Sequence, residues 1–170
     1  FVCPDSLCTG DSIAFINYST GENISTSWDF GDASPLDSRF NPYHLFVPGN
    51  YNVKLTVSDN NNCADTFSKP VFVIDIPIAD FTADTFQSDC APLIVLFSNF
   101  SSGIDLVSYY WDFGDGQNST SVNPQHIFTT NGQFDITLIV TNSIGCRDTI
   151  IKNSFINIEG PSGNFYLLSD

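Results

Sequence analysis

An internal repeat limits the fold of this chain more than any other feature of its sequence. Four blocks recur in the same order, offset by 82 or 83 residues, and the clearest is Trp-Asp-Phe-Gly-Asp at 28–32 and 111–115. The matched blocks are 28–33 with 111–116, 41–46 with 123–128, 51–57 with 134–140 and 63–66 with 146–149. We therefore predict two domains of one fold, over residues 1–75 and 76–159.

The last residues, 160–170, contain a weaker match to the start of the second copy. Pro161-Ser162-Gly163-Asn164-Phe165 lies 84 residues after Pro77-Ile78-Ala79-Asp80-Phe81. We expect a linker and the first strand of a third copy there, and a tail that folds back on the second copy is the alternative.

The apolar residues inside the blocks alternate with polar ones, as they do in half-buried strands. Val53, Leu55 and Val57 share one face of such a strand, and Ile136, Leu138 and Val140 share the face of its counterpart. Short turn signals rich in Gly, Pro and Asn separate the strands, and no amphipathic helical stretch is present. The pattern predicts an all-β protein with a sandwich or barrel of about seven strands in each copy.

The five cysteines suggest disulfides within each copy. Cys8 aligns with Cys90, and Cys63 aligns with Cys146, so the simplest pairing is Cys8–Cys63 and Cys90–Cys146. Each bridge would contribute about 4 kcal/mol in the chain-entropy model, and disulfides indicate an oxidising compartment. Cys3 has no counterpart, so it is either free or paired outside this chain. Zinc binding is disfavoured because no Cys-x-x-Cys pair exists.

The charge of the chain excludes some partners. Nineteen acidic residues against five basic ones give a net charge of −14, which repels nucleic acid and anionic membrane surfaces. No apolar run is long enough to cross a bilayer, so we expect no membrane insertion. Acidity keeps a secreted protein soluble, and it also attracts divalent cations.

The Trp-Asp-Phe-Gly-Asp block, followed by Asn-Pro-x-His-x-Phe and an alternating strand, closely resembles the polycystic kidney disease (PKD) repeat. The cysteine-containing version is similar to repeats of Bacteroidota surface and secreted proteins. The resemblance implies two tandem immunoglobulin-like β-sandwiches without catalytic activity, which serve as spacers or adhesive modules outside the cell. Ala33 departs from the glycine that is usual there, so the turn of the first copy is expected to differ.

The motif residues have structural roles by their chemistry. Trp28 and Trp111 are expected in the cores. Gly31 and Gly114 are expected to take backbone angles closed to other residues. Asp32 and Asp115 can accept hydrogen bonds from nearby backbone N–H groups. The pairs Asp29 with Asp32 and Asp112 with Asp115 could in principle act as glycosidase carboxylates.

That catalytic interpretation is disfavoured, because a duplicated scaffold motif is a poor place for a unique active site. His44 and His126 also occupy equivalent positions without a catalytic pattern around them, so a structural role is favoured. Calcium is the one cofactor that we consider, bound by oxygen ligands of Asp75 and Asp80 at the junction between the copies. No EF-hand pattern supports it.

Modification and sugar binding are further hypotheses. O-glycosylation triplets like those of Bacteroidota place candidates at Ser6, Ser12 and Thr149, and sequons place further candidates at Asn17, Asn23, Asn99 and Asn118. Exposed aromatic residues could stack on sugars, although packing is the commoner role of such residues. The candidates are Tyr18, Tyr43, Tyr109 and Tyr110.

Together these features predict a non-catalytic scaffold or adhesion repeat of a larger cell-surface or fibre-forming protein, a filament of stacked sandwiches. Its partners would be neighbouring repeats, like subunits, or a polysaccharide or surface protein. The alternative is a carbohydrate- or protein-binding spacer module of a secreted hydrolase.

Overall fold

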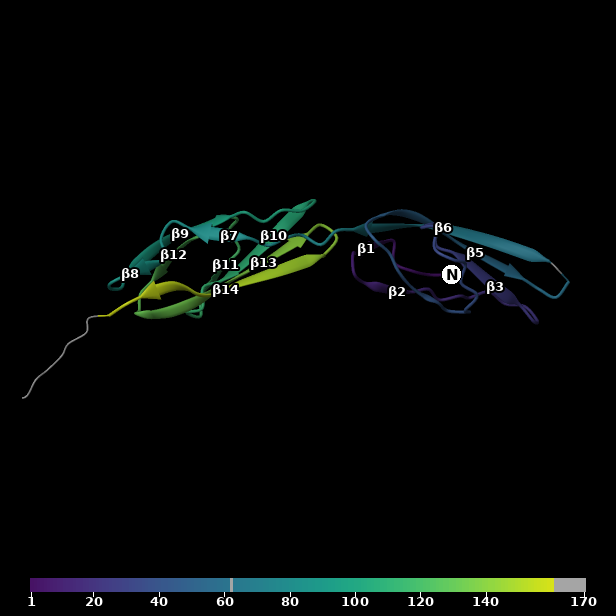
Figure 1. Ribbon diagram of the computed structural model, residues 1–170, viewed down its shortest axis with the longest axis horizontal. Helices are drawn as coiled ribbons and strands as arrows, with labels where there is room; N and C mark the ends of the chain where they lie inside the picture. Colours follow the sequence, from purple (N-terminus) through teal and green to yellow (C-terminus); the bar gives the residue numbers. More distant parts are fainter. Residues whose placement is uncertain (62, 161–170) are drawn as a thin grey trace, which may run out of the picture. The chain divides into compact units, whose positions relative to one another are not determined.

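The computed structural model describes residues 1–61 and 63–160, which form two compact units that separate between Ile76 and Pro77. Within these residues the regular structure is β-strand, with fourteen strands and no helix (Figure 1). The all-β prediction is therefore confirmed. We expect the first strand of a third copy within residues 160–170, and of these the structure describes Gly160 alone. The expected strand therefore lies outside the described residues.

The first domain is an immunoglobulin-like β-sandwich of six strands. One sheet has the order β1-β6-β5-β3, and the other pairs β2 with β4. The strands are β1 (Ser6–Cys8), β2 (Ser12–Ala14), β3 (Ser25–Asp29), β4 (Tyr43–Leu45), β5 (Gly49–Ser58) and β6 (Ala64–Ile74). The long β5 and β6 form a continuous antiparallel ladder from Gly49↔Val73 to Ser58↔Ala64.

The second domain repeats this arrangement with eight strands. Its sheets have the orders β11-β10-β13-β14-β8 and β12-β9-β7. The strands are β7 (Phe81–Ala83), β8 (Gln87–Ser88), β9 (Leu93–Asn99), β10 (Leu106–Asp112), β11 (Asn118–Ser119), β12 (Gln125–Phe128), β13 (Gly132–Asn142) and β14 (Arg147–Ile158). The prediction of about seven strands in each copy lies between the two observed numbers.

Each domain has its own aromatic core, because the alternating strands turn their apolar face inward. Trp28 and Trp111 are both fully buried, and a phenylalanine from the following turn, Phe30 or Phe113, packs beside each. The first core consists of Ile13, Phe15, Trp28, Phe30, Phe46, Val53, Leu55, Val71 and Val73. The second core shares no residue with the first. Each repeat can therefore bury its own hydrophobic face.

Candidate functional site

The duplicated motif forms a turn held by its own carboxylates. Asp29 accepts a hydrogen bond from the Gly31 N–H at 3.0 Å, and Asp32 accepts one from the Ser34 N–H at 3.0 Å. In the second copy, Asp112 accepts from Gly114 at 2.9 Å, and Asp115 accepts from the Gln117 N–H at 3.0 Å. Gly31 and Gly114 have φ values of 75° and 76°, in the left-handed region that favours glycine.

A histidine joins this turn to the opposite sheet in both domains. His44 Nε2 lies 2.7 Å from Asp32 Oδ2, and His126 Nε2 lies 2.7 Å from Asp115 Oδ2. The His44 ring stacks on Phe30 with its centroid 3.8 Å away, and the His126 ring stacks on Phe113 at 4.0 Å. These imidazoles are therefore held between a carboxylate and an aromatic ring.

The indole groups are also satisfied within each domain. Trp28 Nε1 donates to the Arg39 carbonyl at 3.0 Å, and Trp111 Nε1 donates to the Ser121 carbonyl at 2.9 Å. Since the carboxylates, the imidazole and the indole all bind the protein itself, the motif serves to hold the sandwich together. The paired carboxylates are engaged with backbone N–H groups, and this arrangement supports the structural interpretation over the glycosidase one.

The Ala33 position keeps the geometry of its glycine counterpart. Ala33 has φ of 64°, and Gly116 at the matching place has φ of 86°. The turn of the first copy differs farther along the chain, where it is one residue longer: Trp28 pairs with Asp37, nine residues on, whereas Trp111 pairs with Ser119, eight residues on. The first domain accepts a strained alanine conformation, which costs about 1 kcal/mol, because the surrounding hydrogen bonds fix the turn.

We expect the stability of the first domain to depend on pH through the Asp32 carboxylate. Burial pushes the pKa of Asp32 up, but hydrogen bonds from Ser34 and His44 outweigh burial and lower the pKa from 3.8 to about 2. The stabilisation is complete above the unfolded pKa and is lost as the pH falls from about 4 to 2. At pH 7 we expect Asp32→Asn to cost about 2 kcal/mol.

Urea unfolding followed by tryptophan fluorescence between pH 2 and pH 7 measures this effect. The urea midpoint of the native first domain should fall below pH 4, and that of Asp32→Asn should change less in the same interval. Asp11→Asn, at an exposed position of the same domain, is the control. Equal pH profiles for Asp32→Asn and the native chain would exclude the predicted role of this carboxylate.

The cysteines do not pair as predicted. Cys8 and Cys146 are each disulfide-bonded, whereas Cys3, Cys63 and Cys90 are free. Cys8 is level with Ile74 at one end of β6, while Cys63 precedes Ala64 at the other end. Eleven residues of strand separate these levels by about 33 Å, and a disulfide needs Cα atoms about 4.4–6.8 Å apart. The Cys8–Cys63 pairing is therefore wrong.

The same geometry excludes the Cys90–Cys146 pairing. Cys146 directly precedes β14, and Cys90 follows β8, which pairs with the far end of β14 at Ile158. Cys8 does align with Cys90, and Cys63 does align with Cys146. Within each domain, however, the two cysteine positions lie at opposite ends of the last strand, β6 or β14.

Alkylation before reduction should label three cysteines and leave two unlabelled. In denaturant without reductant, Cys3, Cys63 and Cys90 should react, and Cys8 and Cys146 should react only after reduction; peptide mass spectrometry identifies the sites. In the folded protein, Cys3 should react more slowly than the exposed Cys63 and Cys90. Burial raises the pKa of the Cys3 thiol although Lys69 opposes this, so little thiolate forms. Protection of Cys63 and Cys90 would contradict this assignment.

The candidate calcium ligands have limited free coordination. Asp80 lies 3.0 Å from Lys152 Nζ and accepts a hydrogen bond from the Phe81 N–H at 2.8 Å, and Asp75 is exposed. In residues 1–61 and 63–160, no group of three or more His, Cys, Asp or Glu side chains is arranged to hold a metal ion. Calcium binding at Asp75 and Asp80 stays a prediction, which thermal melts in chelator and in millimolar calcium would check.

The candidate glycosylation residues differ in accessibility. Ser6, Ser12, Thr149, Asn23 and Asn118 are exposed, and Asn99 is half-buried. Asn17 is only 5% exposed, and its Nδ2 atom, to which a glycan would be attached, is buried. Asn17 is therefore unavailable in the folded domain, and modification of the other residues stays a prediction.

The tyrosines proposed for sugar stacking lie in different settings. Tyr18, Tyr43 and Tyr110 are 66%, 63% and 41% exposed, whereas Tyr109 packs against the second core. The exposed three remain available for stacking, and Tyr109 is a packing residue.

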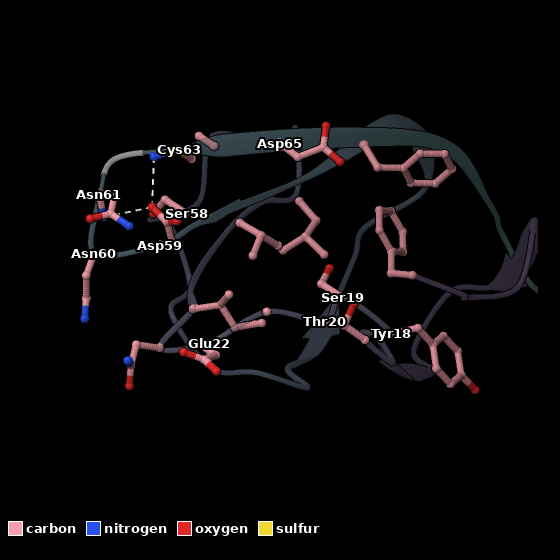
Figure 2. A pocket seen from close by; sticks show the side chains of 18 residues that line it. Tyr18, Ser19, Thr20, Glu22, Ser58, Asp59, Asn60, Asn61, Cys63 and Asp65 are labelled. Carbon is pink, nitrogen blue, oxygen red and sulfur yellow. Dashed lines mark hydrogen bonds between the residues drawn. The ribbon is translucent and has the colours of Figure 1, made fainter.

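The first domain also contains a pocket of about 750 Å³ that the sequence did not predict. Ser19, Thr20 and Glu22 line one side of it, and Asp65 and Ser58 line the other (Figure 2). Phe1, Val57 and Phe67 supply apolar surface. The sequence signal closest to the pocket is Gly21, which aligns with Gly103 of the second copy. In the structure both glycines have a positive φ.

In the described part of the chain, no helix is long and apolar enough to span a membrane.

Comparison with known proteins gives the family relationship. The family model described as "PKD domain" matches residues 3–73 and again 75–156. The pre-pro-metalloprotease PrtV of Vibrio cholerae is 42% identical over 79 residues, which cover 45% of this chain and 8% of that protein. Collagenase ColQ1 of Bacillus cereus is 50% identical over 40 residues, covering 24% of this chain and 4% of the collagenase.

A solved structure of the PKD1 domain of Vibrio anguillarum Epp has 34% sequence identity and a TM-score of 0.44, and the match covers 52% of this chain and 99% of that domain. The chain spans less than a tenth of the length of the protease and of the collagenase that it matches.

Proposed function

We propose that this chain, which belongs to the PKD domain family and carries two copies of the domain, is a non-catalytic spacer module. The module would be part of a larger secreted hydrolase. PKD domains are non-catalytic modules, and the matches to the protease and the collagenase cover only such a module of each enzyme. The observation that carries the proposal is this restriction of the similarity to the module.

The geometry of the motif supports the proposal. In both copies the polar groups of the motif bind the domain's own backbone and histidine. Because these groups hold the turn and the two sheets of their own domain together, the motif makes the module rigid, which suits a spacer. The disulfide-bonded Cys8 and Cys146 favour an oxidising compartment, so we place the protein outside the cell.

A second candidate, adhesion to a polysaccharide or a surface protein, has one specific observation in its favour. Ile94 and Leu96 on β9 and Ile127 on β12 are 52%, 49% and 47% exposed, and they alternate with the buried residues of these strands. Ile94 is directly opposite Ile127 in the ladder. Adjacent exposed apolar side chains of this kind favour contact with a partner.

Sedimentation with insoluble collagen, cellulose and chitin separates the two candidates. A spacer should stay in the supernatant with each material, at the level of an unrelated acidic protein. An adhesive module should sediment with one of the materials. Ile94→Lys should abolish this sedimentation, whereas the control variant Asp11→Asn should sediment like the native chain. Sedimentation that Ile94→Lys abolishes would replace the spacer proposal by the adhesive one, and hydrolysis of any of the materials would contradict both.

A further inference from the structure

The pocket of the first domain occupies a place that polypeptide fills in the second domain. The two domains correspond residue by residue here. Asn17 accepts from the Ser19 N–H at 2.8 Å, as Asn99 accepts from the Ser101 N–H at 2.9 Å. Thr20 and Gly21 in the first domain therefore correspond to Ser102 and Gly103 in the second.

Phe1 corresponds to Phe81 by two independent contacts. The bridge between Val2 and Ile16 is equivalent to the pair Thr82↔Ser98. The Phe1 ring also lies edge-on to Trp28 at 4.9 Å, and the Phe81 ring lies edge-on to Trp111 at 5.1 Å. The residues that precede Phe81 thus show what fits in front of Phe1.

In the second domain the four residues before Phe81 are extended and pair with the neighbouring loop. Ile78 and Ser102 exchange two backbone hydrogen bonds, at 2.8 and 2.9 Å. The Phe100 N–H donates to the Asp80 carbonyl at 2.8 Å, and the Ala79 N–H donates to Asp148 Oδ2 at 2.8 Å.

Apolar contacts complete the seat of these four residues. Ala79 is buried, and Val140, directly opposite Asp148 in the ladder, is fully buried. Pro77 lies so close to Gly103 that a Cβ atom there would be 3.0 Å from the proline Cα. The second domain therefore seats Pro-Ile-Ala-Asp with backbone pairing, a carboxylate and an apolar floor.

The first domain contains the same seat, and its parts line the pocket. Thr20 stands for Ser102, Gly21 for Gly103, and Asp65, opposite Val57 in the ladder, stands for Asp148, opposite Val140. Val57 is only half-buried, in contrast to the fully buried Val140. The pocket thus presents a strand-pairing edge, an acceptor and an apolar floor in the arrangement of the second domain.

We propose that this pocket is the seat of an extended segment of four residues joined directly to the amino group of Phe1. The segment has the Pro-Ile-Ala-Asp character of residues 77–80, its second residue pairs with the backbone of Thr20, and its third N–H donates to Asp65. A covalently joined segment is favoured over a separate peptide because Phe1 already holds the position directly after it, so little loop-closure entropy is lost. The inference does not depend on the proposed function.

The test adds Pro-Ile-Ala-Asp in front of Phe1 of the full chain. We expect the melting temperature of the first domain to rise by about 4–8 °C, and amide exchange at Thr20 to slow by at least about tenfold. The melting temperature of the second domain should not change. The matched control adds Gly-Ser-Gly-Ser, which also neutralises the Phe1 amino group but offers no apolar side chains; equal effects of the two extensions would overturn the proposal.

Two further variants make the result decisive. Asp65→Asn should remove part of the gain from Pro-Ile-Ala-Asp and change the unextended chain little. Replacing residues 77–80 by Gly-Ser-Gly-Ser should lower the melting temperature of the second domain by a similar amount, because it empties the equivalent seat. Unchanged melting after that replacement would show that the seat contributes nothing in either domain, and would overturn the inference.

Discussion

Gly114→Ala is expected to destabilise the second domain by about 3 kcal/mol or more. Gly114 has φ of 76°, and a Cβ atom at this position would lie 2.6 Å from the Asp135 carbonyl oxygen and 3.1 Å from the Asp135 nitrogen. Both obstacles are backbone atoms of β13, so no change of rotamer can relieve the overlap. The strained φ adds its own cost of about 1–2 kcal/mol.

Gly116→Ala is the matched control for this prediction. Gly116 also has a positive φ, of 86°, but a Cβ atom there would meet nothing within 4 Å. The first domain already has Ala33 in the equivalent conformation, so we expect a cost of about 1 kcal/mol. Urea unfolding followed by tryptophan fluorescence measures both variants; equal costs would show that the close approach of β13 is unimportant.

The second large effect is expected for Trp111→Ala, at about 3–5 kcal/mol for the second domain. The indole is fully buried, contacts Phe81 and Phe97, and donates to the Ser121 carbonyl. Its removal leaves a cavity and an unpaired carbonyl group, in a domain whose whole stability is of the order of 5–15 kcal/mol.

The first domain should keep its urea midpoint in Trp111→Ala, because the two cores have no residue in common. Trp28 is then the only tryptophan of the chain, so its fluorescence reports the first domain alone, and far-ultraviolet circular dichroism reports both. Tyr110→Ala, at the neighbouring half-exposed position, should cost much less. A parallel shift of the Trp28 transition would show that the domains do not unfold independently.

Much of the fold follows from local sequence signals. The alternation in 51–57 and 134–140 predicts strands whose inward side chains, such as Leu55 and Leu138, are indeed in the cores. The recurrence of Trp-Asp-Phe-Gly-Asp predicts two domains, because one complete motif supplies the core tryptophan, the turn glycine and the turn carboxylates of one sandwich. These features depend on residues that are close in sequence or aligned between the copies.

The disulfides and the pocket depend on distances across the fold, and the sequence does not contain these directly. Alignment identifies Cys8 with Cys90 and Cys63 with Cys146, but it does not show that β6 or β14 separates the two positions of one copy. The pocket likewise brings together residues that are distant in sequence, such as Thr20 and Asp65. In the second domain the equivalent place is filled through contacts of residues 77–80 with residues 100–103. The second domain shows what such a place can hold, because four extended residues before Phe81 fill it.

All residues of each buried core come from one copy of the sequence repeat. A single recombination event can therefore duplicate or delete a whole domain. Such an event leaves the buried side chains of the remaining unit in place, so no compensating substitutions are needed. The natural joint for such an event lies just before the four residues that precede the first core phenylalanine, at Ile76 and Pro77. A cut made later, at Phe81, would take away the strand segment that closes the sandwich.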